Sequence, residues 1–168
     1  MPYINNIQPS AYFAGQIADS NPKGQISGIN ATANPINFGL AMVFDPTSQG
    51  FIVPTAASDI KRQMAVNAII NRNKYYKYDV DENVVITDNS SVASGGMCNG
   101  YVQGTVAVLV EDAVQSGFPC FIRYAAGAGG TILGSFRSDD DTATAAAQPN
   151  WYFYTAAAAG TIALVHVI

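Results

Sequence analysis

The sequence predicts an all-β protein, a β-barrel or jelly-roll-like sandwich with an extended N-terminal arm and at most one short helix. Short apolar runs rich in β-branched and aromatic residues alternate with turn-forming residues from residue 38 onward. No long helical pattern separates these runs, which disfavours a parallel α/β sheet. The chain has 168 residues, enough for one hydrophobic core. We therefore expect a single β-barrel domain over residues 37–168.

Residues 1–36 are expected to form the arm, because they contain four prolines and little sustained hydrophobic period. Strands are expected at residues 38–44, 51–53, 64–70, 75–78, 84–86, 105–110, 120–124, 131–133, 151–155 and 161–168. The helix is expected within residues 57–64, where Ser58 or Asp59 could cap one or two turns. Glycine-rich segments at 94–96 and 127–130 indicate turns between strands.

The composition is unusual in how few charges it contains. Charged residues make up 12% of the chain, against about 25% in ordinary soluble domains. Such a surface suits a protein that is covered by partner subunits, although a large core with a neutral polar surface explains the composition equally well. The net charge of −4 and the eight scattered basic residues argue against direct binding of nucleic acid.

The N-terminal residues lack the pattern of a secretory signal, and no apolar stretch is long enough to cross a membrane as a helix. We therefore expect synthesis in a cytoplasm and no membrane partner. Cys98 and Cys120 are too few for a disulfide framework, so they are expected to be free thiols.

The residues needed for common catalytic and cofactor sites are missing. His166 is the only histidine, and alternation places it on one strand face with Leu164 and Ile168, as a tolerated strand residue. No Gly-x-Ser-x-Gly elbow or phosphate-binding glycine loop is present. We expect no catalytic residues, no cofactor and no metal site, and hence no enzyme.

Acidic residues at 139–141, together with Glu111 and Asp112 or with residues 79–82, could in principle supply oxygen ligands for Ca²⁺. Their spacing does not match an EF-hand loop, so a solvated acidic loop is the preferred interpretation. An assembly-stabilising Ca²⁺ remains the alternative.

Aromatic residues stand on both faces of two expected strands, and only one face can enter a given core. We interpret the other face as a subunit contact, because tyrosine and tryptophan contribute strongly to buried interfaces. A second core layer and a carbohydrate-stacking platform remain alternatives. With two aromatics of the arm, the candidate interface residues are Tyr12, Phe13, Tyr75, Tyr76, Tyr78, Trp151, Tyr152 and Tyr154.

The second half of the chain contains several motifs, in one order, that resemble those of a known protein family. Residues 113–123, Ala-Val-Gln-Ser-Gly-Phe-Pro-Cys-Phe-Ile-Arg, resemble the family hairpin A-V-x-x-G-x-P-V-Y-V-R, with Cys120 in place of the usual valine. Gly-Ser-Phe-Arg at 134–137 resembles the G-x-F-R turn, and residues 151–168 resemble the closing aromatic strand, alanine-rich turn and last strand. Residues 17–20 and 38–43 resemble the arm and first strand, whereas residues 61–78 are more polar and aromatic than the family pattern.

By these motifs the chain resembles the structural cement proteins of tailed-phage capsids. The resemblance implies a β-barrel that forms homodimers or homotrimers and binds the outer surface of a phage capsid. There it would bridge neighbouring major capsid proteins and stabilise the shell, after synthesis in the host bacterial cytoplasm. Two other classes remain open. One is a glycan-binding module of a phage tail or receptor-binding protein that stacks sugars on Trp151, Tyr152 or the tyrosines at 75–78. The other, ranked last, is a hydrolase that uses carboxylates such as Glu111 and Asp112.

Overall fold

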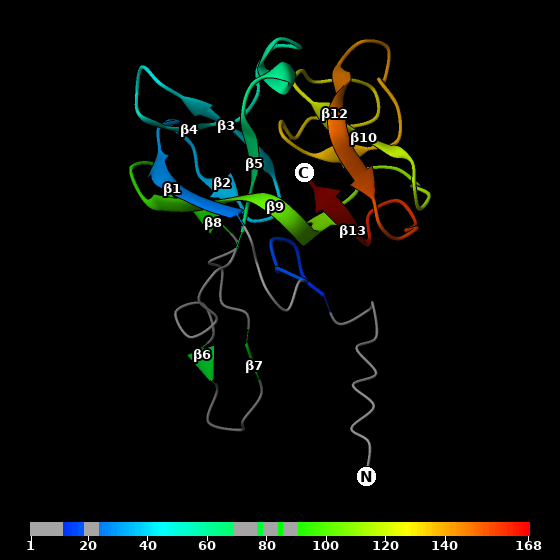
Figure 1. The fold of residues 1–168 in the computed structure, drawn as a ribbon, viewed down its shortest axis with the longest axis horizontal. Helices are drawn as coiled ribbons and strands as arrows, with labels where there is room; N and C mark the ends of the chain where they lie inside the picture. Colours follow the sequence, from blue (N-terminus) through cyan, green and yellow to red (C-terminus); the bar gives the residue numbers. More distant parts are fainter. Residues whose placement is uncertain (1–11, 19–23, 69–76, 79–83, 86–90) are drawn as a thin grey trace.

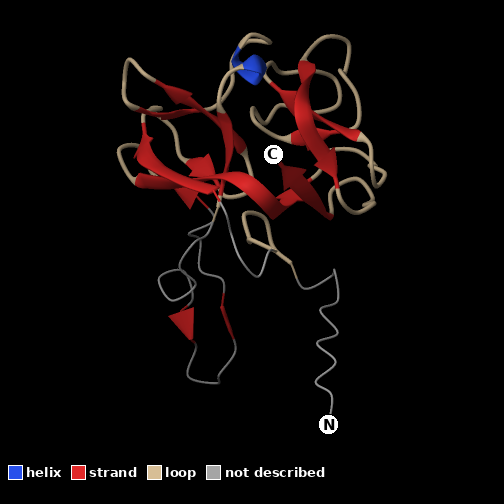
Figure 2. Ribbon diagram, viewed as in Figure 1, coloured by secondary structure: helices blue, strands red, loops and turns tan. Residues whose placement is uncertain are grey.

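A computed structural model describes residues 12–18, 24–68, 77–78, 84–85 and 91–168 (Figure 1). Its strands are β1 (Gly24–Asn30), β2 (Ile36–Asn37), β3 (Ala41–Asp45), β4 (Gly50–Ile52), β5 (Met64–Asn67), β6 (Lys77–Tyr78), β7 (Val84–Val85), β8 (Ser91–Val92), β9 (Met97–Leu109), β10 (Pro119–Arg123), β11 (Phe136–Arg137), β12 (Ala145–Phe153) and β13 (Ile162–Val167). A 3₁₀ turn, η2 (Asp59–Lys61), lies within the segment expected to be helical. The all-β fold class is confirmed, as Figure 2 shows.

Strand β9 connects the two parts of the fold, because its two halves belong to two different rings of strands. Its first half pairs with β1 and β5, and the order β1-β4-β3-β5-β9 closes on itself through the β1–β9 pairing. Its second half, Gly104–Leu109, pairs with β13 and continues through β12 and β10 to β11. A bridge between Val110 and Phe136 brings the end of this second ring back to the end of β9. The two rings form the two lobes of Figure 1.

Two hydrophobic clusters fill the structure, and strands β3 and β5 contribute to both. Met42 and Ala65 belong to the smaller cluster, which also contains Phe51 and Cys98 of the first ring. Their neighbours along the strands, such as Val43 and Val66, belong to the larger cluster with the buried residues of the second ring. Because side chains alternate between strand faces, β3 and β5 separate the two clusters. This explains why these strands have apolar residues on both faces.

The described residues before β1 lie against the second half of β9. The Gly15 amide donates to Ala107 O at 2.7 Å, the Ala107 amide donates to Gln16 O at 2.8 Å, and the Ala18 amide donates to Thr105 O at 2.9 Å. Ile17 packs against the larger cluster. Residues 12–18 and Gly24–Asn30 were expected in the arm but contribute to the folded body, whereas residues 1–11 lie outside the described residues.

Some of the other expected strands differ from the strands in the structure, and some lie partly outside the described residues. The strand expected at 105–110 is much longer and begins at Met97. Residues 131–133 form no strand, because a turn at Gly134 with φ of +82° follows them. The strand expected at 75–78 is described only at Lys77–Tyr78, and residues 69–70, 75–76 and 86 of the expected strands lie outside the described residues. Within the described ranges, no helix is long and apolar enough to span a membrane.

Candidate interaction surface

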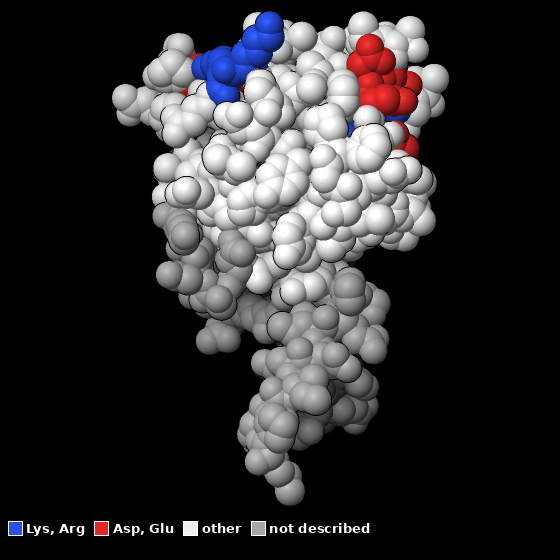
Figure 3. All heavy atoms as spheres, turned by 45° about the vertical axis from the view of Figure 1, so that its right-hand side comes forward, with Lys and Arg blue, Asp and Glu red and all other residues white. Residues whose placement is uncertain are grey.

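Charged side chains of the described residues gather in two places. One group surrounds η2 and the end of β3, with Asp45, Asp59, Lys61 and Arg62; the other contains Glu111, Asp112, Arg123, Arg137, Asp139, Asp140 and Asp141. The side chain of Lys77 is not described. Strands β1, β9, β12 and β13 contain no Lys, Arg, Asp or Glu. In Figure 3 the coloured side chains gather toward one edge, and the described surface beside them is uncharged.

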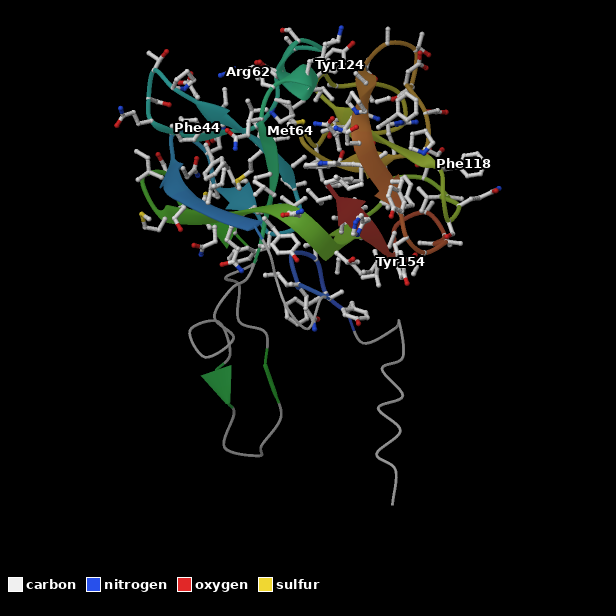
Figure 4. All side chains as sticks on the ribbon, viewed as in Figure 1. Phe44, Arg62, Met64, Phe118, Tyr124 and Tyr154 are labelled. Atoms are coloured by element: carbon white, nitrogen blue, oxygen red, sulfur yellow. The ribbon has the colours of Figure 1, made fainter. Side chains whose placement is uncertain are left out.

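Two large aromatic residues are exposed at the outside of the second ring, on two segments whose backbones lie next to each other. Phe118 is 51% exposed and Tyr154 is 59% exposed. Their backbones are adjacent, because the Phe153 amide donates to Phe118 O at 2.9 Å and Ser116 Oγ donates to Tyr154 O at 2.9 Å. Figure 4 shows both labelled side chains at the outside of the second ring. This is an arrangement that a partner surface could cover.

A row of cross-strand partners continues the surface from Tyr154 toward β9. Tyr152 of β12 pairs with His166 of β13, which pairs in turn with Thr105 of β9. The Tyr152 and His166 rings lie 5.2 Å apart, and Thr105 Oγ1 lies 3.2 Å from His166 Nδ1. We call Phe118, Tyr152, Tyr154 and His166 the aromatic face. His166 does share a strand face with Leu164, as alternation predicted.

The candidate interface residues of the sequence separate into three groups. Tyr152 and Tyr154 belong to the aromatic face, whereas Trp151 is only 3% exposed and stacks on Phe136 in the larger core cluster. Trp151 therefore has almost no surface to offer a partner of this chain. Tyr12 and Phe13 are half-buried in the segment beside β9. Tyr75 and Tyr76 lie outside the described residues, and the side chain of Tyr78 in β6 is not described.

The second charged group is an ionic cluster built around two buried arginines. Arg123 Nη2 lies 2.8 Å from Glu111 Oε2 and 2.7 Å from Asp141 Oδ2. Arg137 Nη1 lies 3.2 Å from each of the same two oxygens, and Arg137 Nη2 lies 2.6 Å from Asp139 Oδ1. The side chain of Arg123 is fully buried and that of Arg137 is 6% exposed. Sequence reasoning missed both arginines as partners of the acidic residues.

These contacts show what the acidic residues do in the described structure. Hydrogen bonds from Arg123 hold the pKa of Asp141 below its ordinary value, and hydrogen bonds from Arg137 do the same for Asp139. Hydrogen bonds to Glu111 raise the pKa of Arg123. The loop is therefore more than a solvated acidic segment. In the part of the chain that the structure describes, no group of three or more His, Cys, Asp or Glu residues could hold a metal ion.

The ionic cluster also supports an uncommon backbone turn. Asp141, Thr142 and Ala143 have φ of 42°, 60° and 63°, in the left-handed region that non-glycine residues rarely adopt. Tyr124 Oη donates to Ala143 O at 2.6 Å, and the Thr144 amide donates to Asp140 O at 2.9 Å. Arg123 Nη1 donates to Thr144 Oγ1 at 2.9 Å. The cluster thus stabilises the turn in this backbone conformation.

Both cysteines are buried and free, as expected. Burial raises the pKa of Cys98 to about 11, and the pKa of Cys120 is raised as well. Because the thiolate is the reactive form, neither residue offers a nucleophile at neutral pH.

Comparisons with known proteins give one matching family and a solved structure with a similar fold. The family model described as "Structural cement protein (E217 gp24/Pam3 gp6)" matches residues 2–168. A chain of the solved structure "The capsid of Myoviridae Phage XM1" has a similar fold, with a TM-score of 0.60 and 17% sequence identity; the match covers 99% of this chain and 97% of that chain. No curated protein matches the sequence.

Proposed function

The chain belongs to the structural cement protein family, and from that premise we propose that it decorates the outer surface of a phage capsid and bridges neighbouring major capsid proteins. The family implies a structural role in the virion rather than catalysis. The protein would be made in the cytoplasm of the host bacterium and would bind after or during shell assembly. Its partners would be the major capsid protein and further copies of itself, as a dimer or a trimer.

The uncharged aromatic face is the observation that carries this proposal. Removing a charged group from water costs several kcal/mol unless the group is paired, by a rough estimate, whereas an uncharged face can be covered without that cost. Phe118 and Tyr154 are each more than half exposed, and aromatic side chains contribute strongly when a partner buries them. We propose that neighbouring subunits, including a second copy of the chain, cover this face. Trp151 is left out of the proposed contact because it lies in the core.

The mechanism is adhesive. Each copy makes several modest contacts, and once one contact has formed, the next becomes an intramolecular event with a high effective concentration. Several contacts must then be released before neighbouring capsid proteins can separate. We assign one of them to residues 1–11, as an arm that lies over an adjacent subunit. Residues 1–11 are the first part of the arm expected at residues 1–36 from its prolines, and they lie outside the described residues.

The first test is composition and imaging of purified phage particles. We expect a copy number comparable to that of the major capsid protein by mass spectrometry. Cryo-electron microscopy should place the corresponding density outside the shell, between capsomers. A low copy number at the tail would favour the glycan-binding alternative, for which the exposed Phe118 and Tyr154 would be the stacking residues. Absence from the particles would refute both.

A second test asks whether the aromatic face makes the contact. Phe118→Lys and Tyr154→Lys each place a charge on the face, and we expect each variant to bind purified cement-free shells at least tenfold more weakly in a co-sedimentation assay. Ile132→Lys is the matched control, because Ile132 is also half exposed (50%) but lies in the loop before β11, beside the ionic cluster. Circular dichroism checks that the variants fold. Equal binding by all three variants would show that the face is not the contact.

A further inference from the structure

Four large hydrophobic side chains among the described residues are exposed as two pairs, one beside the strands of each ring. Ile29 of β1 and Met97 of β9 face each other in the first ring and are 41% and 60% exposed. Opposite residues of an antiparallel ladder stand on the same face, so these two side chains form one apolar patch. Phe118 and Tyr154 are the second pair, on adjacent segments of the second ring. Single exposed apolar residues are ordinary, whereas grouped ones are typical of interaction sites.

The two pairs lie on different sides of the molecule, so a single copy cannot bring them together. Met97 begins β9, and Leu109 at the other end of the strand lies up to about 40 Å away in extended backbone. The second pair lies beyond that end, because the Tyr154 amide donates to Leu164 O of β13, which pairs with the second half of β9. In the common view of Figures 1 and 4, β1 lies at the left and the labelled Phe118 and Tyr154 lie at the right.

Both pairs adjoin strands without charged residues. Strands β1 and β9 beside the first pair contain no Lys, Arg, Asp or Glu, and neither do β12 and β13 beside the second. The charged residue in the same cross-strand row as Ile29 is Asp45, which faces Gly50 of β4, while Gly50 faces Ile29. Asp45 already lies 3.9 Å from Arg62. Covering the Ile29–Met97 pair therefore does not require that Asp45 lose this partner.

We propose that the two pairs meet between copies of the chain, with the Ile29–Met97 pair of one copy packed against the Phe118–Tyr154 pair of the next. This inference rests on the proposed function, and it names a second copy as the occupant of Phe118 and Tyr154. Every copy carries both halves of the contact, so a head-to-tail arrangement covers both exposed pairs at once. The flexible thioether of Met97 also makes favourable contacts with aromatic rings beyond the area that it buries.

Such a contact is heterologous, because the two surfaces that touch are different. Heterologous contacts produce closed rings or open chains of copies, in contrast to a two-fold dimer, in which the same surface meets itself. The contact is also small, since two apolar side chains from each copy bury much less than the area of about 800 Å² per partner that is typical of stable complexes. It becomes effective on the shell, where attachment holds neighbouring copies at a high effective concentration.

The test places one cysteine beside each pair and links neighbouring copies with a short bis-maleimide. Ser94→Cys lies in the turn before Met97, and Gln115→Cys lies three residues before Phe118; both positions are exposed. Both native cysteines are buried, so the unmodified full-length protein serves as the blank. Each protein is bound to purified cement-free shells, sedimented, treated with the reagent and separated by denaturing electrophoresis.

A head-to-tail contact gives a distinctive set of products. We expect no linked product from either single variant alone, dimers from an equal mixture of the two, and longer linked chains or a ring from the protein with both substitutions. Adding Met97→Lys to that double variant should lower the linked fraction per bound copy about tenfold, because a charge would then be buried against the rings. Leu109→Lys is the matched control, since Leu109 is 47% exposed at the other end of β9, and it should leave the linked fraction nearly unchanged.

The other outcomes separate this inference from the proposed function. Linked dimers from a single variant alone would overturn the inference, because like surfaces would then meet about a two-fold axis. Normal occupancy of the shells without any linked product would overturn it as well, leaving the major capsid protein as the occupant of the exposed pairs and the cement function intact. Failure of the unmodified protein to sediment with the shells would refute the proposed function, and the inference with it.

Discussion

Arg123 donates a 2.7 Å hydrogen bond to Asp141 from a side chain that is fully buried, across 18 residues of sequence. The same guanidinium binds Glu111, which follows the end of β9. One arginine thus joins β10, the end of β9 and the left-handed turn before β12. Buried ion pairs of this kind are costly to form but more costly to break, because a remaining partner keeps its charge without compensation.

Replacing Arg123 should therefore destabilise the protein strongly. We expect Arg123→Met to lower the free energy of unfolding by about 3–5 kcal/mol, since the substitution leaves Glu111 and Asp141 without their buried partner. Equilibrium urea unfolding measures the change. Arg62→Met is the control, because Arg62 is 38% exposed and pairs at the surface with Asp45 and Asp59, where such pairs contribute about 0–1 kcal/mol. Similar losses in the two variants would contradict a special role for the buried cluster.

Acid should weaken the fold through the same cluster. The pKa values of Asp139 and Asp141 are held below the ordinary value near 3.8 by Arg137 and Arg123, respectively. A carboxylate whose pKa is lowered by folding stabilises the protein above its unfolded pKa, and this stabilisation is lost as the pH falls through its folded pKa. We therefore expect urea midpoints to be nearly constant above pH 5 and to fall steadily below pH 4.

The contribution of Asp141 to this acid sensitivity can be isolated. Asp141→Asn should be less stable at pH 7 and should lose less stability between pH 5 and pH 2.5 than the unmodified protein, since one of the titrating groups is gone. Asp140→Asn is the matched control, because Asp140 is exposed and no side-chain contact of it is described. An acid profile that is identical in all three proteins would exclude Asp141 as a source.

Gly39 should be essential for holding residues 12–18 against the body. Its φ is +81°, and an added Cβ would lie 2.7 Å from the Ala14 Cβ atom and 3.0 Å from the Gly15 amide nitrogen. Gly39→Ala should therefore displace the segment and accelerate hydrogen exchange of the Ala107 amide, which donates to Gln16. Gly95→Ala controls for backbone strain, because Gly95 has φ of +72° but no atom near an added Cβ. Equal effects at the two positions would show that the close contact is unimportant.

The sequence predicted the fold class because alternation and turn residues are local signals. Strands β4, β10 and β13 lie within or close to the expected ranges for this reason. The first half of β9 was missed because glycines disfavour strands in isolation. Gly100 is nevertheless needed there, since an added Cβ would lie 2.7 Å from Ala65 and 2.8 Å from the Phe51 ring. Such close approach is a tertiary requirement that local propensity does not report.

The candidate site was predictable only in part, for a related reason. Alternation separates Tyr152 from its neighbours Trp151 and Phe153, but it does not say which face enters the core when both faces are aromatic. Packing decided this, with Trp151 stacked on Phe136. The contacts of Glu111 in the ionic cluster were missed because the partners are far apart in sequence, by 12 residues for Arg123–Glu111 and by 26 for Arg137–Glu111. The sequence pointed to the acidic residues, but it did not indicate that their arginine partners are buried.

Truncations should locate the boundary between arm and body. Deleting residues 1–11 leaves every described element in place, so we expect an unchanged urea midpoint. Deleting residues 1–30 removes β1, which pairs with both β4 and β9 and closes the first ring. The longer deletion should expose two unpaired strand edges and give an unfolded or aggregated protein, as circular dichroism and size-exclusion chromatography would show.

The shorter truncation also tests the arm as a contact, because it separates folding from attachment. If residues 1–11 bind an adjacent subunit, the truncated protein should be folded and yet occupy cement-free shells less completely than the full chain at equal concentration. Full occupancy would remove the arm from the mechanism and leave attachment to the aromatic face. A stable, folded protein after deletion of residues 1–30 would instead contradict the closure of the first ring by β1, since the strand that pairs with both β4 and β9 would then be dispensable.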